Sequence, residues 1–344
     1  MKILIAILIF SFIIIFHEYG HFLAARACGV RVNEFWLGMG PTIFHFTKGE
    51  TTYCLKALPF GGACVMEGEE GDSEDERAFC SKPLWKRALI VAAGPLFNVL
   101  LGLILSIVML GAMGVMKPVV DTLTDGYPAQ EAGIEPGDTI TALNHYHIYF
   151  YNEISVYTYL HAGEALDVTY LRNGEEKTAT IEPQYDASTG RYYLGITAVP
   201  KMTKLSALQT IGYSFCELRY QFYVALEGIK MLFTGQVGLS DMSGPVGIVK
   251  VIGDTYDASV SSGILYVVMN LINITVLLTT NLAVANLLPI PALDGGRLLI
   301  FLIEAVSRRR VNEQIEARIN MIGFCFLMGL MVVVMISDIS KLFV

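Results

Sequence analysis

The residues His17-Glu18-Tyr19-Gly20-His21 form a short motif whose side chains could bind a metal and activate water. On a helix His17 and His21 are four residues apart and share a face, so both imidazoles can reach one metal ion. Glu18 follows the first histidine and can act as a general base on a water molecule beside that metal. Three ionisable side chains at the end of an apolar run are costly unless they serve a site, which favours a functional role over a structural one.

A catalytic zinc needs a third protein ligand, and Asp294 is our candidate for it. It lies in the segment Pro289-Ile290-Pro291-Ala292-Leu293-Asp294-Gly295-Gly296, directly after an apolar stretch. Two prolines and two glycines predict irregular backbone, which is tolerated at membrane depth where protein buries it or water reaches it. The other histidines lack a partner motif or fall on the opposite side of the membrane, and we expect solvated or structural roles for them: His45, His145, His147 and His161.

The composition places these residues in an integral membrane protein. The chain has 344 residues, of which 53% are hydrophobic and 16% charged, and its mean hydropathy is +0.52. A soluble domain has roughly 45–50% apolar and about 25% charged residues. The net charge of −8 and the absence of a basic stripe in the sequence argue against nucleic acid as a partner. The six cysteines are scattered without a Cys-x-x-Cys pair, so they predict neither a disulfide framework nor a thiolate zinc site.

Four stretches are long enough to cross a bilayer core, which needs about 20 apolar helical residues. They are residues 3–24, 88–115, 263–288 and 319–336. The first could also be a signal peptide, but cleavage after its small residues would discard the His17–His21 motif.

The distribution of Lys and Arg predicts the orientation of these stretches. Residues 25–87 contain eight and residues 295–318 contain five, against nine in the much longer stretch 116–262. The first two regions are therefore expected in the cytoplasm and 116–262 on the opposite side. The first and third spans then both run inward, and Asp294 arrives at the depth of the two histidines.

Residues 117–200 have the pattern of a small, mostly β domain, with alternating runs separated by turn signals such as Arg172-Asn173-Gly174. Tyr127-Pro128-Ala129, residues 132–140 and Leu143-Asn144 resemble the core of bacterial PDZ domains. Such domains add an extended peptide or a C-terminus to a sheet edge. The alternative is a spacer that blocks access sterically and binds nothing.

We therefore expect a multi-pass α-helical membrane protein with four transmembrane helices and an inserted small β-rich PDZ-like domain. Residues 205–233 carry one apolar stripe at helical spacing, typical of a helix lying on the membrane or against the bundle. The predicted domains are an N-terminal membrane part (1–116), the PDZ-like domain (117–202), the amphipathic helix with a connecting segment (203–262) and a C-terminal membrane part (263–344).

Taken together, the motifs resemble the site-2 protease family, and within it the bacterial RseP/RasP type with a single PDZ domain. Besides the His17–His21 motif and the PDZ-like insert, the matching segments are Phe60-Gly61-Gly62, Lys82-Pro83-Leu84-Trp85-Lys86-Arg87, Gly94-Pro95-x-x-Asn98, Ser243-Gly244-Pro245-Val246-Gly247 and Asn286-x-x-Pro289-x-Pro291-x-Leu293-Asp294-Gly295-Gly296. The segment after Gly62 resembles the membrane-reentrant hairpin of the family. There this chain has Ala63-Cys64-Val65 instead of the usual Tyr-Val-Lys.

The resemblance implies an intramembrane zinc endopeptidase of the bacterial plasma membrane. Its substrates would be single-span membrane proteins, such as anti-sigma factors or remnant signal peptides, already trimmed by a site-1 protease. By position, His17, His21 and Asp294 would bind Zn²⁺ and Glu18 would be the catalytic base. Asn281 and Asn286 resemble the asparagines that bind the unwound substrate backbone, with hydrogen bonding between helices as the alternative. The PDZ-like domain would be extracytoplasmic and the active site near the cytoplasmic side.

Two other classes of protein compete with this interpretation. One is a catalytically inactive membrane module that binds client proteins through its PDZ-like domain, which the intact Glu18 and the complete ligand set argue against. The other is a zinc transporter that uses the intramembrane His and Asp residues as its path, which the Pro/Gly loop and the insert fit poorly.

Overall fold

The computed structural model describes residues 1–69, 73–198, 201–238 and 242–341. Its contacts divide the chain into two units. One combines Met1–Ser106 with Gln221–Val344, and the other is Ile107–Tyr220. The His17–His21 motif and Asp294, far apart in sequence, belong to the same unit.

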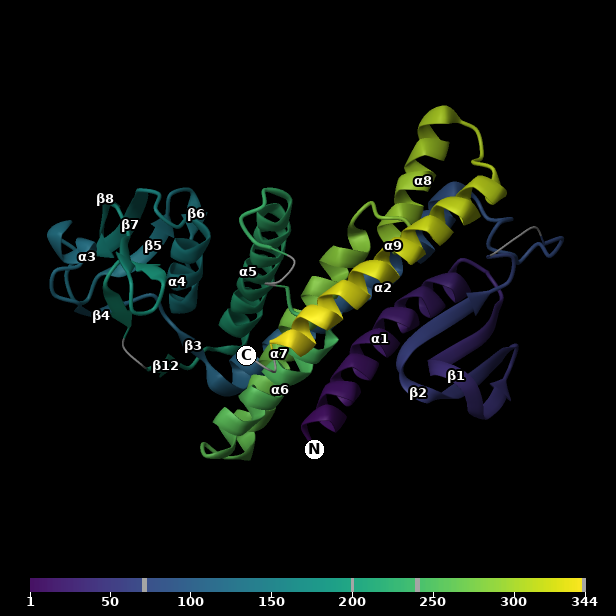
Figure 1. Cartoon of the computed structure of the whole chain (residues 1–344), viewed down its shortest axis with the longest axis horizontal. Helices are drawn as coiled ribbons and strands as arrows, with labels where there is room; N and C mark the ends of the chain where they lie inside the picture. Colours follow the sequence, from purple (N-terminus) through teal and green to yellow (C-terminus); the bar gives the residue numbers. More distant parts are fainter. Residues whose placement is uncertain (70–72, 199–200, 239–241, 342–344) are drawn as a thin grey trace. The chain divides into compact units, whose positions relative to one another are not determined.

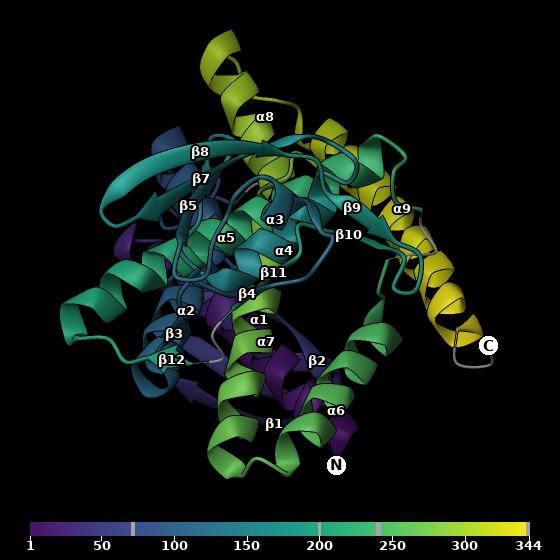
Figure 2. The same cartoon turned by 90° about the vertical axis from the view of Figure 1, so that its left-hand side faces the viewer.

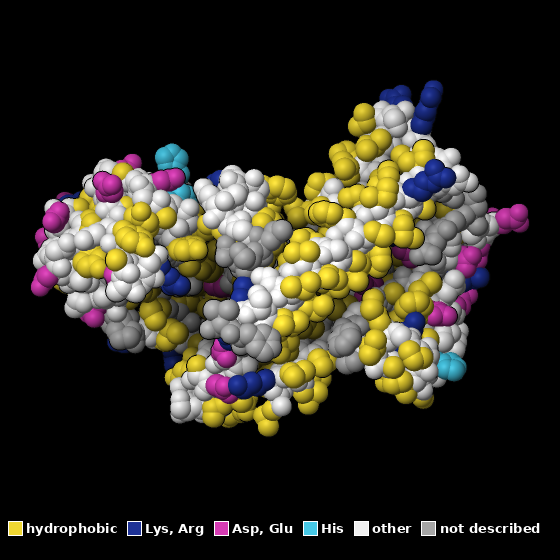
Figure 3. All heavy atoms as spheres, viewed as in Figure 1, with side chains coloured by type: hydrophobic (Ala, Val, Ile, Leu, Met, Phe, Trp, Pro, Cys, Tyr) yellow, Lys and Arg dark blue, Asp and Glu magenta, His cyan; other side chains and the backbone are white. Residues whose placement is uncertain are grey.

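Four helices in the described part of the chain are long and apolar enough to cross a membrane. They coincide with the four apolar stretches expected from the sequence. These helices are α1 (Lys2–Ala27), α2 (Leu84–Met113), α7 (Ile264–Leu287) and α9 (Glu313–Ser340). Hydrophobic side chains follow α9 across the surface of its unit (Figure 3), as expected where lipid replaces water.

Helix α1 is the centre of the first unit. It packs against α6 (Pro245–Val260), α7 and both strands of a hairpin, β1 (Val32–Lys48) and β2 (Thr51–Met66), as Figure 1 shows. One buried cluster contains Phe22 of α1, Phe35 of β1, Ile90 of α2 and Phe301 of α8 (Asp294–Ser307). This shared core fixes the helix with the histidines against the helix that begins with Asp294.

The start of α8 is set by the residues around Pro289. Helix α7 ends at Leu287, and Leu288, which precedes the proline, has extended backbone with ψ of 143°. The chain then turns back and α8 begins at Asp294. A Cβ on Gly295 would lie 2.1 Å from the carbonyl oxygen of Leu288, so only glycine lets the first turn of α8 approach the end of α7 this closely.

The segment after Gly62, which resembles a membrane-reentrant hairpin, belongs to a pair of long antiparallel strands, β1 and β2, with several shifts of register. The far end of the hairpin exposes apolar side chains, including Ile43 (69% exposed) and Phe44 (59%). The side chain of Phe60, in the predicted Phe60-Gly61-Gly62 motif, and that of the preceding Pro59 lie outside the described part of the structure.

The second unit is rich in β-structure, as Figure 2 shows. A four-stranded antiparallel sheet has the order β6-β5-β7-β8 and buries Ile140, Leu143, Leu166 and Val168. The turn Asn173-Gly174 joins β7 to β8 with positive φ at both residues, as the sequence predicted. Shorter strands pair as β3–β12, β4–β11 and β9–β10.

The bounds in and beside this unit are β3 (Val115–Met116), β4 (Val120–Leu123), α3 (Pro128–Glu131), β5 (Thr139–Leu143), β6 (Tyr146–His147), α4 (Tyr151–Leu160), β7 (Leu166–Arg172), β8 (Glu175–Ile181), β9 (Gln184–Asp186), β10 (Arg191–Tyr193), β11 (Ile196–Ala198), β12 (Met202–Thr203) and α5 (Ala207–Phe233). Helix α5 covers most of the predicted amphipathic segment. The domain limits 117–202, 203–262 and 263–344 stay predictions.

Candidate active site

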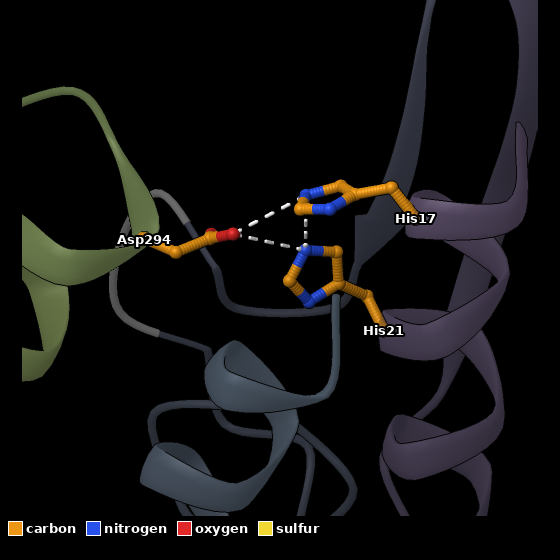
Figure 4. A group of neighbouring side chains, drawn as sticks. All are labelled: His17, His21 and Asp294. Carbon is orange, nitrogen blue, oxygen red and sulfur yellow. Dashed lines mark hydrogen bonds and ion pairs between the residues drawn. The ribbon is translucent and has the colours of Figure 1, made fainter. Parts of the chain in front are cut away.

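The imidazoles of His17 and His21 lie one above the other on α1 and face Asp294 of α8 (Figure 4). Their Nε2 atoms are 3.2 Å apart. Oδ2 of Asp294 lies 3.2 Å from Nε2 of His17 and 3.5 Å from Nε2 of His21. Both histidines are buried, with 7% and 8% of their surface exposed. The structure thus brings together the three residues that the sequence singled out as metal ligands.

The hydrogen bond of His21 orients its ring for metal binding. Its Nδ1 lies 2.9 Å from the carbonyl oxygen of Ile90 on α2. A carbonyl oxygen only accepts, so Nδ1 carries the proton and Nε2 keeps its lone pair. That lone pair is directed toward His17 and Asp294. Ligand histidines are commonly held in this way.

Asn98 of α2 is the neighbour of the other histidine. Its Nδ2 lies 3.1 Å from Nδ1 of His17, it has 0% exposed surface, and its Oδ1 has no hydrogen-bond partner among the residues that the structure describes. Rotating the amide by 180° exchanges the oxygen and the nitrogen with little change of shape. Oδ1 would then accept a hydrogen bond from Nδ1–H of His17 and leave Nε2 free to bind a metal.

Gly94 gives the two imidazoles the space they occupy beside α2. A Cβ on this glycine would lie 2.2 Å from Nε2 of His21 and 2.8 Å from Cε1 of His17. No side chain fits at these distances without a shift of one of the rings. The Gly94-Pro95-x-x-Asn98 segment thus contributes both space and a polar group to the site.

The donor set fits a zinc ion. A tetrahedral zinc with bonds of about 2.0–2.1 Å separates its ligand atoms by roughly 3.3 Å. The three separations here are 3.2, 3.2 and 3.5 Å. Oδ2 of Asp294 is buried and accepts no hydrogen bond from any described residue, although it faces both imidazoles. Two imidazoles and one carboxylate, with a fourth position left for water, are a common catalytic zinc set.

Glu18 is held beside this cluster by the hairpin. The backbone N–H of Cys64 in β2 donates a hydrogen bond of 3.1 Å to Oε2 of Glu18. A Cβ on Gly62 would come within 3.1 Å of Cγ of Glu18, so the strand passes close to the carboxylate. The hairpin therefore fixes the carboxylate at the wall of the site.

A cavity of about 800 Å³ opens on these groups, and both histidines, Glu18 and Asp294 line it. Of the two asparagines predicted to bind substrate, Asn286 of α7 lines this cavity. Asn281, five residues earlier on the same helix, is exposed and is not among the described residues that line it.

The sequence did not single out two further residues of the cavity wall. Arg297 lies one turn after Asp294 on α8, and its Nη1 is 2.6 Å from Oε1 of Glu69. For Arg297 the available signal was a charged side chain three residues from an expected metal ligand. The pairing itself depends on a contact between segments more than 200 residues apart.

An apolar helix bundle that buries a His-Glu-x-x-His motif and an aspartate around one cavity defines a class, the membrane-embedded metallopeptidases. The model of Peptidase family M50 matches residues 5–330, and the chain therefore belongs to this family. It is a multi-pass membrane protein and a zinc metalloendopeptidase of the site-2 protease type.

Relatives match over nearly the whole chain. A Clostridium acetobutylicum protein, provisionally named a zinc metalloprotease, is 37% identical over 339 residues, which cover 98% of this chain and 97% of its own. Zinc metalloprotease RasP of Geobacillus kaustophilus is 32% identical, with 98% and 97% coverage. The regulator of sigma-W protease RasP of Bacillus subtilis is 30% identical, with 98% coverage of both chains. The PDZ domain of an SdrC-like protein of Listeria monocytogenes aligns at 24% identity, with a TM-score of 0.21, over 25% of this chain and 88% of that one.

The family and the RasP relatives support a zinc protease of regulated intramembrane proteolysis, which acts on membrane proteins within a lipid bilayer.

Proposed function

We propose that this protein cleaves single-span membrane proteins of the anti-sigma-factor or remnant-signal-peptide type, after a site-1 protease has trimmed their outer part. The observation that carries the proposal is the buried cluster of His17, His21 and Asp294 with the carboxylate of Glu18 at the wall of the same cavity. The name of the sigma-W regulating relative supports an anti-sigma factor as the kind of substrate.

His17, His21 and Asp294 would hold the zinc ion. When bound, zinc polarises a carbonyl group and makes a bound water more acidic. The hydrogen bond from His21 to the carbonyl of Ile90 holds one imidazole in place, and the amide of Asn98 beside Nδ1 of His17 holds the other. These contacts would fix the position of the zinc ligands. Burial of these groups excludes bulk water from the charges of the site.

Glu18 is the general base and then the general acid. It takes the proton of the attacking water and returns it to the nitrogen of the departing amine, so that this nitrogen leaves as a neutral amine and not as an amide anion. The N–H of Cys64 holds Oε2 in place through both transfers.

A substrate helix must unwind before its carbonyls can react, because they are hydrogen-bonded within the helix. Asn286, in the cavity wall, offers an amide that can pair with the freed backbone groups. Asn281 would have to meet the substrate outside the cavity, on the exposed surface of α7. Helix-weakening residues in the substrate should therefore speed cleavage.

The distribution of Lys and Arg supports an orientation in the bacterial plasma membrane with the β-rich unit outside the cell. His17, His21 and Asp294 would then lie near the cytoplasmic side. In this arrangement the PDZ-like unit meets the outer part of a substrate, while the cut is made within the span.

The test is cleavage of a single-span model substrate by the full chain in detergent. Wild type should cleave, Glu18→Gln should lose at least about 100-fold in rate because a general base typically contributes 10²–10⁴-fold, and a zinc chelator should abolish the activity. Glu164→Gln, the same change at an exposed residue of the other unit, should behave as wild type. Zinc content should be equal in wild type and Glu18→Gln. Turnover of Glu18→Gln near the wild-type rate would refute the assignment, and a substrate left intact under every condition would favour a client-binding module.

A further inference from the structure

Among the described residues that line the active-site cavity, Arg297 is the only Lys or Arg. Four acidic residues line the same cavity: Glu18, Glu67, Glu69 and Asp294. A cation in such a wall loses part of its hydration, which is costly unless the charge is paired or serves a ligand. The proposed reaction uses Glu18 and Asp294 and leaves Arg297 without a role.

Arg297 shares a face of α8 with Asp294. The two residues are three apart in the first turns of this helix, a spacing that places Cβ atoms about 5–6 Å from one another. Both side chains line the cavity, and the arginine side chain is long enough to span that separation. A peptide carbonyl that reacts beside Asp294 is therefore within reach of the guanidinium of Arg297.

Most hydrogen-bond donors of Arg297 are available to a ligand. A guanidinium has five N–H donors in a planar fork. Nη1 donates to Oε1 of Glu69 at 2.6 Å, and this is the one hydrogen bond that the side chain of Arg297 makes with a described residue. The side chain is 26% exposed, so the remaining donors are open to the cavity or to water. They suit a second carboxylate, which a guanidinium binds through two parallel hydrogen bonds.

Glu69 holds the guanidinium at the cavity wall. Its Oε1 accepts from Arg297, and its Oε2 accepts a hydrogen bond of 3.3 Å from the backbone N–H of Met66 at the end of β2. The carboxylate of Glu69 is thus fixed to the hairpin by one oxygen and to α8 by the other. Glu69 is 19% exposed, and ion pairs open to solvent contribute little free energy, so the guanidinium can share or exchange this partner at small cost.

We propose that Arg297 binds the α-carboxylate that cleavage creates on the N-terminal fragment of the substrate, and that Glu69 holds the guanidinium in position for it. This inference rests on the proposed function. Hydrolysis forms a bond from the water oxygen to the carbonyl carbon and breaks the C–N bond, with a proton passing to the departing amine. The carboxylate is the new anion of this reaction, and Arg297 offers it a cation in the cavity wall.

The test measures fluorescence polarisation with the full chain in detergent. The probe is an octapeptide of alternating Ala and Leu with fluorescein at its N-terminus. It is made in three forms: with a free C-terminal carboxylate, as the C-terminal amide, and as an amide whose last residue is Glu. Zinc itself binds carboxylates, so the protein is first freed of metal with a chelator. Wild type should bind the free carboxylate about 10- to 100-fold more tightly than either amide, the effect of hydrogen bonds to charged groups.

Substitutions of the ion pair separate recognition from packing. Arg297→Gln should bind all three probes alike, with the amide affinity of wild type. Arg297→Lys keeps the charge without the planar fork and should keep only part of the preference for the carboxylate. Glu69→Gln removes the competing charge and should bind the carboxylate probe about 2- to 10-fold more tightly. Arg318→Gln, at an exposed arginine of α9 that is not part of the cavity lining, should behave as wild type.

The zinc-loaded chain gives a second readout. The carboxylate probe should inhibit cleavage of the model substrate, and its inhibition constant should rise about 10-fold in Arg297→Gln. Zinc content should be equal in wild type and Arg297→Gln, because Arg297 is not a ligand in this proposal.

Three results would overturn the proposal. They are equal binding of carboxylate and amide by metal-free wild type, a preference that is unchanged in Arg297→Gln, and binding of the Glu amide as tight as that of the free carboxylate. The last result would mean that the site recognises an acidic side chain of the substrate. A chain that cleaves the model substrate without this preference refutes the role of Arg297 alone. A chain that prefers the carboxylate but cleaves nothing refutes the proposed function and leaves the carboxylate site in place.

Discussion

The side-chain amide of Asn98 lies 3.1 Å from Nδ1 of His17, and its oxygen is buried without a partner in the part of the chain that the structure describes. The backbone carbonyl of the same residue accepts a hydrogen bond of 3.2 Å from the hydroxyl of Thr279. Asn98 therefore connects α2 to α1 through one group and to α7 through another. Asn98 has 0% exposed surface, and burying a polar side chain is costly. A role of its amide in selecting the tautomer of His17 explains why a polar residue occupies this position.

Asn98→Asp and Asn98→Leu separate this role from simple packing. A carboxylate in place of the amide still accepts a hydrogen bond from Nδ1–H of His17. The zinc affinity of Asn98→Asp should therefore stay within a few-fold of the wild-type affinity. Asn98→Leu removes the acceptor and should weaken zinc binding about 10- to 100-fold, as losses of such supporting groups do. Zinc affinity is measured by competition with a chromogenic chelator. Asn281→Leu is the control, because it makes the same change at an exposed position of α7. Equal loss in both Asn98 variants would contradict the orienting role.

Asp294→Asn tests the third ligand. The change keeps the shape of the side chain but removes the negative charge that faces two imidazoles at 3.2 and 3.5 Å. Zinc affinity should fall at least about 100-fold, beyond the range expected for a supporting residue. Asp254→Asn, at an exposed position of α6, should retain the wild-type zinc content. Full zinc occupancy in Asp294→Asn, measured by mass spectrometry of the metal, would exclude Asp294 as a ligand.

Gly94→Ala tests the space beside the imidazoles. The new methyl group would lie 2.2 Å from Nε2 of His21, a ring that its bond to the carbonyl of Ile90 holds in place. We expect displacement of the ring and at least about a 10-fold loss of zinc affinity, while the helix itself gains from the change of Gly to Ala. Gly228→Ala in α5 has no atom within 4 Å of the added methyl group and should leave zinc binding unchanged. Normal zinc binding in Gly94→Ala would show that α2 can move away from α1.

The parts of this structure that sequence could predict are those set by periodicity and spacing. Apolar length predicted the four helices, and the i, i+4 spacing predicted that His17 and His21 share one face of a helix. Asp294 was reached by counting membrane crossings, which places two segments at one depth but gives no distance. Spacing could also have separated the two asparagines: residues five apart on a helix point about 140° away from each other, and only Asn286 lines the cavity.

The remaining features depend on contacts between segments far apart in the chain. The hydrogen bond from the N–H of Cys64 to Glu18 forms because a long hairpin folds against α1. The sequence of this hairpin has no regular alternation of polar and apolar residues from which its strand pairing could be predicted. The orientation of Asn98 depends on which ring nitrogen of His17 carries the proton. No pattern of residue types contains that information.

Arg172 and Asp138 give a prediction about pH in the β-rich unit. Asp138 has 1% of its side chain exposed, and Nε and Nη2 of Arg172 donate to its two oxygens at 2.8 and 2.7 Å. Burial alone would raise the pKa of Asp138, but the hydrogen bonds from Arg172 and from the backbone N–H of Glu135, together with the positive charges of Arg172 and Lys177, outweigh it and hold the pKa below the ordinary value. The ionised pair therefore stabilises the folded unit above the unfolded pKa of about 3.9, and this contribution is lost as the pH falls through the lower, folded value.

Arg172→Met should lower the free energy of unfolding of this unit at pH 7, because it leaves the buried carboxylate of Asp138 without its charged partner. In the variant, burial is no longer opposed by Arg172, so protonation of Asp138 relieves the destabilisation and the difference from wild type should shrink on acidification toward pH 4. Hydrogen-exchange protection factors of β5 and β7 report this difference, because they remove the intrinsic effect of pH on exchange. Arg191→Met, at an exposed arginine of β10, should match wild type at each pH. A difference between Arg172→Met and wild type that stays constant from pH 7 to pH 4 would show that Arg172 stabilises the unit by packing and not through the charge of Asp138.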